Sequence, residues 1–215
     1  MIIMAHRGYW ETETEKNSLT ALQRALSEGY GFESDIRDYA KRLVISHNIA
    51  DVDSPDAETV FRWLFNYQDQ FCFAINIKAD GLGSLLSDLL EQYHITNYFA
   101  FDMSVPQMIE YVNRGITCFT RQSEVETEPV LYEKAAGVWI DGFWGTDWIT
   151  ESLLQNHIAN EKTVCLVSPE LHGREHLTFW KQLAEFKIDF SRVMLCTDKP
   201  VEAANFFARQ LERGA

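Results

Sequence analysis

The sequence has few of the features that would set it apart from ordinary globular proteins. No apolar run approaches the roughly 18 residues that a membrane-spanning helix requires. The apolar start MIIMA is also too short for the core of a signal peptide. No linker, low-complexity segment or repeat interrupts the 215 residues. We therefore expect a single domain over residues 1–215, with no stable insertion into a membrane.

Cysteines and basic residues are also few. The four cysteines lie far apart, each inside an apolar run, which favours packed, reduced thiols in a cytoplasmic protein over disulfides or a zinc site. The chain has 19 Lys and Arg against 32 Asp and Glu, a net charge of -13. This charge argues against binding to nucleic acid or to an anionic membrane. An anionic ligand would need clustered cationic side chains or a metal ion at its binding site.

Short apolar runs alternate with helical patterns along the chain, which is typical of parallel strands joined by helices. Eight β units suggest a (β/α)8 TIM barrel, although 215 residues is short for that fold. The alternative is an open doubly wound sheet, but its glycine-rich turn is missing because HRGYWE does not match GxGxxG. The predicted strands are 2–6, 31–36 with 43–47, 72–78, 98–102, 117–121, 137–141, 163–168 and 193–198. The predicted helices are 18–29, 57–68, 84–93, 105–114, 150–158, 176–186 and 201–213, with a short one at 130–135.

Nearly every predicted strand finishes with a polar or ionisable residue. Because side chains alternate along a strand, Glu33, Asp35 and Arg37 share one face. In a (β/α)8 barrel the active site lies at the carboxyl ends of the strands. The candidate residues at or near these ends are His6, Arg7, Glu33, Asp35, His47, Asn76, Lys78, Asp102, Arg121, Asp141 and Glu170.

These residue types match the parts of a phosphoryl-transfer site. Two carboxylates two positions apart can share one hard divalent cation, Mg2+ or Ca2+. Two histidines offer an acid and a base that titrate near neutral pH. Arg7, Lys78 and Arg121 offer positive charge for a phosphate.

The acidic residues after the later strands also have a simpler interpretation. Asp or Glu just after a strand is often a helix N-cap or a turn residue. This applies to Asp102, Asp141 and Glu170. For Asp198, which precedes Lys199-Pro200 and a predicted helix, capping is the favoured role.

The order HRG…NSL…FESD…ISH…IK resembles the glycerophosphodiester phosphodiesterase family over residues 4 to 78. The resemblance implies a TIM barrel of the phospholipase C-like phosphodiesterase type that hydrolyses a small-molecule phosphodiester with one divalent cation, Mg2+ or Ca2+. It implies that His6 and His47 are the catalytic acid and base, that Arg7 contacts phosphate and that Lys78 is the lysine of the third strand. Arg121 is expected to contact phosphate from its charge and its place at a strand end alone. It further implies that Glu33 and Asp35 are metal ligands and that Asn76 lies at the position of a further ligand. Asp102, Asp141 and Glu170 are expected to line the site because they follow strand ends.

The sequence departs from the family pattern at several positions. Lys16 occupies the slot of the glutamate in the family's Glu-Asn pair and displaces Glu15, Asn48 rather than Asp follows His47, and Asn76 stands where the family has another glutamate. Two alternatives therefore stay open. One is a phospholipase-type enzyme that acts on a lipid headgroup, and the other is a barrel that binds a phosphate-containing ligand without catalysis. For the aromatic stretch GFWGTDWIT, with Phe143, Trp144 and Trp148, we expect packing of a loop rather than exposure.

Overall fold

The computed structural model describes residues 1–211, and strands and helices alternate along it as the sequence predicts. The strands are β1 (Ile2–His6), β2 (Gly31–Tyr39), β3 (Arg42–Ile45), β4 (Phe73–Ile77), β5 (Tyr98–Phe101), β6 (Phe119–Ser123), β7 (Gly137–Asp141), β8 (Thr163–Val167) and β9 (Val193–Thr197). The helices are α1 (Leu19–Ser27), α2 (Glu58–Asn66), α3 (Gly83–Gln92), α4 (Val105–Asn113), α5 (Glu151–Ala159), α6 (Leu177–Glu185) and α7 (Pro200–Leu211).

The strand order confirms the (β/α)8 barrel fold. Eight strands are hydrogen-bonded in the order β5-β4-β2-β1-β9-β8-β7-β6, and β3 pairs with β2 outside this order. The pairs β2–β4, β4–β5, β7–β8 and β8–β9 are parallel. A parallel bridge between Ala100 and Cys118 links β5 to the residue that precedes β6. An open doubly wound sheet would lack this link between the two end strands of the order.

Several predicted boundaries shift. The strand predicted at 31–36 extends to Tyr39, where a tight turn through Ala40 and Lys41, both with positive φ, leads into antiparallel β3. The strand predicted at 117–121 is β6, which begins at Phe119. The short helix predicted at 130–135 is a three-residue 3-10 helix, Tyr132–Lys134. The last two residues of the helix predicted at 201–213 lie outside the described residues.

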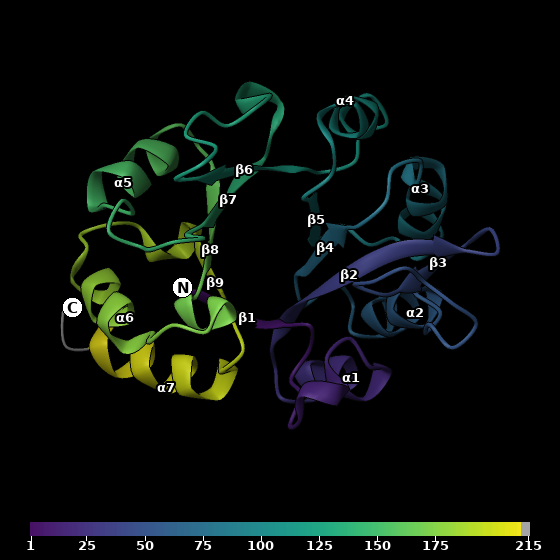
Figure 1. Ribbon diagram of the computed structural model, residues 1–215, viewed down its shortest axis with the longest axis horizontal. Helices are drawn as coiled ribbons and strands as arrows, with labels where there is room; N and C mark the ends of the chain where they lie inside the picture. The colour runs from purple at the N-terminus through teal and green to yellow at the C-terminus, as the bar shows by residue number, and fades with distance from the viewer. Residues whose placement is uncertain (212–215) are drawn as a thin grey trace. The chain divides into compact units, whose positions relative to one another are not determined.

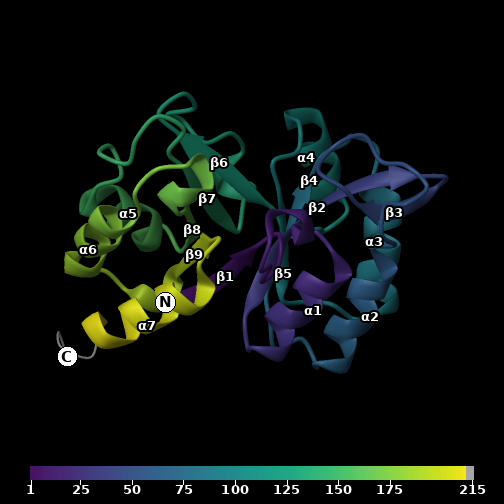
Figure 2. The same cartoon turned by 60° about the horizontal axis from the view of Figure 1, so that its bottom comes forward.

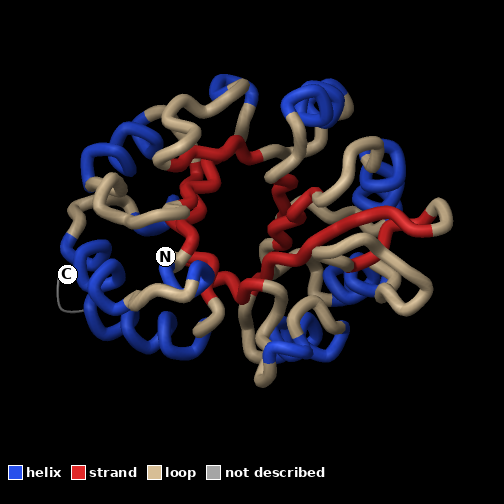
Figure 3. Tube along the Cα trace, viewed as in Figure 1, coloured by secondary structure: helices blue, strands red, loops and turns tan. Residues whose placement is uncertain are grey.

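The chain divides into two compact units. The N-terminal unit is Ala5–Phe119, and the C-terminal unit combines Met1–Met4 with Thr120–Ala215. In the N-terminal unit, α1 to α4 lie on one side of β2, β4 and β5 (Figure 1, Figure 2). In the C-terminal unit, α5, α6 and α7 likewise lie on one side of β7, β8 and β9, as the blue helices and red strands of Figure 3 show. Each unit therefore buries its strands against its own helices.

Each unit has its own apolar core. In the N-terminal unit the Phe32 and Phe73 rings lie 5.0 Å apart, and Phe61 packs on Phe73 at 5.8 Å. In the C-terminal unit the fully buried Trp180 donates its indole N–H to the Ser168 hydroxyl over 2.8 Å. The four cysteines are free and buried, as predicted. Burial raises the pKa of the Cys72 and Cys118 thiols to about 12, so both stay protonated at neutral pH.

The turn after β1 depends on Gly8. Its φ is +84°, and a Cβ there would lie 2.6 Å from the backbone carbon of Ala21 in α1. Only glycine meets both conditions without strain. Helix α1 then starts at Ser18, whose side chain accepts a hydrogen bond from the Ala21 N–H over 3.1 Å, as the predicted cap requires. The turn leads directly from the end of β1 to the residues of the candidate site.

Among the residues described, none of the helices has the length and apolar composition needed to span a bilayer.

Candidate active site

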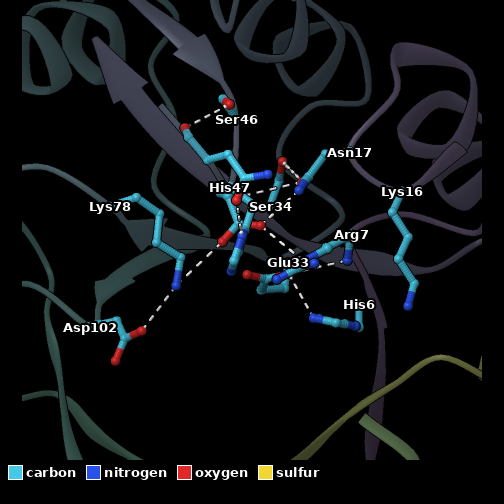
Figure 4. A network of polar contacts seen from close by, with 12 residues as sticks. His6, Arg7, Lys16, Asn17, Glu33, Ser34, Ser46, His47, Lys78 and Asp102 are labelled. Atoms are coloured by element: carbon cyan, nitrogen blue, oxygen red, sulfur yellow. Dashed lines mark hydrogen bonds and ion pairs between the residues drawn. The ribbon is translucent and has the colours of Figure 1, made fainter. Parts of the chain in front are cut away.

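The end of β1 meets the middle of β2 in the N-terminal unit. The backbone N–H of Arg7 donates to Glu33 Oε2 over 3.1 Å, and His6 Nε2 lies 3.9 Å from the same oxygen. Arg7 adopts a left-handed conformation with φ 55°, which is uncommon for a non-glycine residue. This backbone conformation places the imidazole and the guanidinium beside the two carboxylates of β2 (Figure 4).

Asp35 is at the centre of a polar network. Its side chain is fully buried. Asp35 Oδ2 lies 2.9 Å from Arg7 Nε and accepts a hydrogen bond from the Asn17 amide over 2.7 Å. Asp35 Oδ1 lies 3.4 Å from Lys78 Nζ. A carboxylate at this depth is stable only with such partners, because burying an unpaired charge costs several kcal/mol.

Asn17 belongs to this network, although it was not among the predicted site residues. Besides its bond to Asp35, its carbonyl oxygen accepts from the Ser34 hydroxyl over 2.8 Å and from the Asp35 N–H over 3.3 Å. Its φ of 62° is left-handed, a conformation that asparagine tolerates better than most residues. Its position in the NSL segment, directly before the Ser18 cap, was the signal that could have identified it.

Lys78 connects β4 to β5. Its Nζ lies 3.2 Å from Asp102 Oδ2 as well as 3.4 Å from Asp35. Asp102 has a left-handed φ of 69° and follows directly after β5. The cap of α4 is Ser104, which accepts from the Gln107 N–H over 3.3 Å. The simpler interpretation of Asp102 as a helix cap is therefore wrong.

Asn76 is the register partner of Asp35 on the neighbouring strand β4. Its side chain is 8% exposed, and within residues 1–211 its Oδ1 accepts no hydrogen bond. Asp35 Oδ1 also accepts none there, although Lys78 lies within ion-pair distance. Buried oxygen atoms without donors suit a hard cation, which binds carboxylate and amide oxygens.

The oxygen ligands available here are of the chemical type that a hard cation binds, but together they carry little negative charge. Glu33, Asp35 and Asn76 supply two carboxylates and one neutral amide. Within residues 1–211, no group of three or more His, Cys, Asp or Glu side chains is arranged to hold a metal ion. Burial raises the pKa of the Glu33 carboxyl, and the neighbouring Asp35 charge raises it further, against the lowering effect of His6, Arg7 and Lys78. A cation between the two carboxylates would remove this repulsion.

His47 follows β3 in the same unit and is exposed. Ser46, the residue before it, donates its N–H to the Asp35 carbonyl over 3.0 Å, which ties the end of β3 to β2. Arg37 Nε and Nη2 each lie 3.4 Å from the His47 carbonyl oxygen, and the His47 ring contacts the Asn48 side chain at 3.1 Å. The chain thus holds the backbone of His47 from two sides while its imidazole stays open to solvent.

The other three predicted site residues belong to the C-terminal unit. Arg121 pairs with Glu126. Asp141, at the end of β7, contacts His172 Nε2 at 2.6 Å, and Thr150 rather than Asp141 caps α5. Glu170 accepts from the hydroxyls of Ser168 and Thr197 and from the Asp198 N–H, which joins the ends of β8 and β9. The Glu170 contacts are those of a structural residue.

The expectation for the aromatic stretch 142–150 is wrong at one position. Trp148 packs against the core of the C-terminal unit, and the Phe143 ring lies 5.6 Å from that of His172. Trp144, in contrast, is 77% exposed. The Glu124 carboxylate accepts from the N–H groups of residues 143, 144 and 145, which anchors the backbone of this loop while the Trp144 indole faces solvent.

Comparisons with known proteins support the fold. No protein-family model and no curated protein matches the chain. Among solved structures, it is similar to a protein from Galdieria sulphuraria assigned as a glycerophosphodiester phosphodiesterase (TM-score 0.78, 15% identity, 96% of this chain and 97% of that one). It is also similar to a glycerophosphodiester phosphodiesterase from Parabacteroides distasonis, with a TM-score of 0.71 and 16% identity over 100% of this chain and 98% of that one.

A third similar structure is a Ca2+-dependent phosphatidylinositol-specific phospholipase C from Streptomyces antibioticus. Its TM-score is 0.60 at 10% identity, over 96% of this chain and 95% of that one. At these identities the likeness establishes the fold. The resemblance first seen in HRG, FESD and ISH is therefore confirmed at the level of the fold: the chain has the (β/α)8 barrel found in these phosphodiesterases.

Proposed function

We propose that the chain is a phosphoric diester hydrolase that cleaves a glycerophosphodiester to glycerol 3-phosphate and an alcohol. The observation that carries this proposal is the convergence of His6, Arg7, Glu33, Asp35 and Lys78 in one polar network of the N-terminal unit. Structures with the same fold are glycerophosphodiester phosphodiesterases and a phospholipase C, which supports this class of reaction. We also propose that residues 1–215 act as one catalytic domain.

In the proposed reaction, His6 and His47 divide the proton transfers. One imidazole takes a proton from the attacking hydroxyl or water, and the other gives a proton to the departing alcohol oxygen as the P–O bond breaks. Arg7 and Lys78 contact the phosphate oxygens and offset their negative charge. Asp102, whose Oδ2 lies 3.2 Å from Lys78 Nζ, is a candidate lining residue of this site.

One divalent cation, Mg2+ or Ca2+, is part of this proposal. Glu33 and Asp35 would hold it, and the Asn76 carbonyl oxygen would assist. When bound, such an ion polarises a phosphoryl oxygen and offsets developing charge. The buried oxygen atoms of Asp35 and Asn76 that accept no hydrogen bond within residues 1–211 support this assignment.

The test is an activity screen over glycerophosphodiesters with added Mg2+, Ca2+ or Mn2+. We expect turnover by the wild-type protein and a loss of about 10² to 10⁴ in rate for His47→Ala, the usual range for an acid or base catalyst. His94→Asn, an exposed histidine of the same unit, is the matched control and should retain activity. Phosphate-ligand binding without turnover would favour a non-catalytic barrel.

A phospholipase-type enzyme that acts on a lipid headgroup is the second candidate. The exposed Trp144, on the loop whose backbone donates to Glu124, favours this candidate because indole side chains bind at membrane–water interfaces. This candidate predicts faster turnover of a substrate in zwitterionic vesicles than of the same headgroup in solution, and Trp144→Ala should abolish the difference. Equal rates on both substrate forms would favour the glycerophosphodiester.

A further inference from the structure

We propose that a divalent cation and the phosphate group of the substrate bind this site cooperatively, each strengthening the binding of the other. The inference rests on the proposed function for the location of the site. It concerns the charge balance of this particular chain, in which Asn76 places an uncharged ligand beside the two carboxylates. The cation should therefore bind weakly until a phosphate anion joins it.

The permanent charges of the network do not balance. Three carboxyl groups, on Glu33, Asp35 and Asp102, face two permanent cations, on Arg7 and Lys78, so one negative charge is left over. Both cations already lie within ion-pair distance of the central Asp35, at 2.9 and 3.4 Å. A divalent ion added to this network produces an excess positive charge, which is costly at a buried site. A phosphodiester anion cancels that excess.

Asn76 is a buried ligand that brings no charge. Its side chain is more than nine-tenths buried, and its Oδ1 accepts no hydrogen bond within residues 1–211. Its register partner Asp35 has an Oδ1 in the same state. Both oxygens are therefore available as ligands for a cation, but the amide contributes no negative charge to attract it. A phosphate oxygen can supply both the missing ligand and the missing charge.

Thermodynamic linkage makes the effect of the two ligands on each other reciprocal. If phosphate strengthens the binding of the cation by some factor, the cation must strengthen the binding of phosphate by the same factor. Coupling between two ligands typically changes affinity by about 5- to 150-fold. Direct contact between the ligands favours the upper part of this range, so we expect at least about a tenfold change in either direction.

The experiment measures binding rather than turnover. Mn2+ is titrated into the full-length protein by calorimetry and by electron paramagnetic resonance, with and without dimethyl phosphate, a phosphodiester anion with poor leaving groups. Dimethyl phosphate is then titrated with and without Mn2+. We expect each ligand to lower the dissociation constant of the other by about tenfold or more, and by the same factor. Equal Mn2+ affinity in both conditions would overturn the proposal.

Asn76→Asp tests the cause of the cooperativity. The added carboxylate should strengthen Mn2+ binding without phosphate by about tenfold or more and should reduce the coupling. Asn113→Asp, on an exposed position of α4, makes the same change in net charge and should leave the coupling unaltered. Unchanged coupling in Asn76→Asp would contradict the role given to Asn76. The wild-type titrations decide the matter if this variant does not fold.

The two proposals can fail separately. If the protein hydrolyses glycerophosphodiesters but Mn2+ and dimethyl phosphate bind independently, the proposed function holds and the cooperativity is wrong. If binding is cooperative and requires Glu33 and Asp35 but no phosphodiester is cleaved, the cooperativity holds and the proposed hydrolase activity is wrong.

Discussion

The side-chain amide of Asn17 donates a hydrogen bond to Asp35 Oδ2 over 2.7 Å, and its carbonyl oxygen accepts from the neighbouring Ser34 hydroxyl over 2.8 Å. Asn17 therefore orients the central carboxylate of the site and holds the strand that carries it. Asn17→Gly removes these bonds but keeps a residue suited to φ 62°. We expect it to cost about 1–3 kcal/mol of stability, since buried groups lose their partners, and to lower kcat/KM. Thermal unfolding and kinetics measure both effects, and unchanged kcat/KM would show that Asn17 does not position Asp35.

The raised pKa of the Glu33 carboxyl makes the stability of the folded protein depend on pH. Burial and the Asp35 charge raise the pKa of its carboxyl. A raised pKa means that the folded state holds this proton more tightly, so the stabilising contribution is full below the unfolded pKa and is lost as pH rises through the folded pKa. Glu33→Gln should therefore raise Tm at neutral pH, by about 2–4 °C for each kcal/mol gained, and the gain should shrink at pH 4. Activity should fall.

The control for this prediction is Glu91→Gln on the surface of α3, which should leave Tm nearly unchanged at both pH values. A Glu33→Gln protein that is less stable than wild type at neutral pH would show that the Glu33 charge is well compensated in the folded state. Saturating Mg2+ or Ca2+ should raise the Tm of the wild type and not that of the variant.

His157 makes the C-terminal unit sensitive to acid. It is buried, its Nε2 lies 2.8 Å from the side-chain oxygen Oε1 of Gln122, and its Nδ1 lies 2.9 Å from the Tyr132 hydroxyl. Burial lowers the pKa of this imidazole. Its contribution to stability is therefore present above the unfolded value of about 6.5 and is lost as pH falls below it. Urea unfolding at pH 7.5 and 5.5 should show a larger loss for wild type than for His157→Gln.

Exposed His94 provides the comparison. His94→Asn should show the same acid sensitivity as wild type, because His94 is exposed and takes no part in the contacts of His157 with Gln122 and Tyr132. If His157→Gln also loses as much stability between the two pH values as wild type does, the sensitivity arises at other groups.

Alanine substitutions at Gly8 and Gly29 distinguish the energetic cost of backbone strain from the cost of steric overlap. Both have φ near +84°, but a Cβ on Gly8 would lie 2.6 Å from the Ala21 backbone, whereas nothing lies within 4 Å of one on Gly29. Gly29→Ala should cost about 1–2 kcal/mol for the left-handed conformation alone. Gly8→Ala should cost more and should reduce activity, because the turn carries His6 and Arg7. Equal unfolding free energies for the two variants would contradict the close approach.

Much of the fold and part of the site could be predicted from the sequence. Strand and helix periodicity identified eight β units, and parity placed Glu33 with Asp35 and Asn76 with Lys78, because alternation along a strand is a local property. Asn17 was missed because its role depends on a left-handed backbone and on contact with a strand 18 positions away. The exposure of Trp144 was also missed. Loop position there is set by the distant Glu124, and no periodic pattern reports such a contact.

The most direct test of the proposed hydrolase compares two substrates in His6→Ala and His47→Ala. One substrate is a glycerophosphodiester with an alkyl alcohol, and the other is a nitrophenyl phosphodiester, whose leaving group scarcely needs a proton. We expect both variants to lose about 10² to 10⁴ in rate on the first substrate. The variant that lacks the acid should recover much of its rate on the second, and the variant that lacks the base should not. If both variants hydrolyse the glycerophosphodiester at near wild-type rates, the two histidines are structural and the proposed mechanism is wrong.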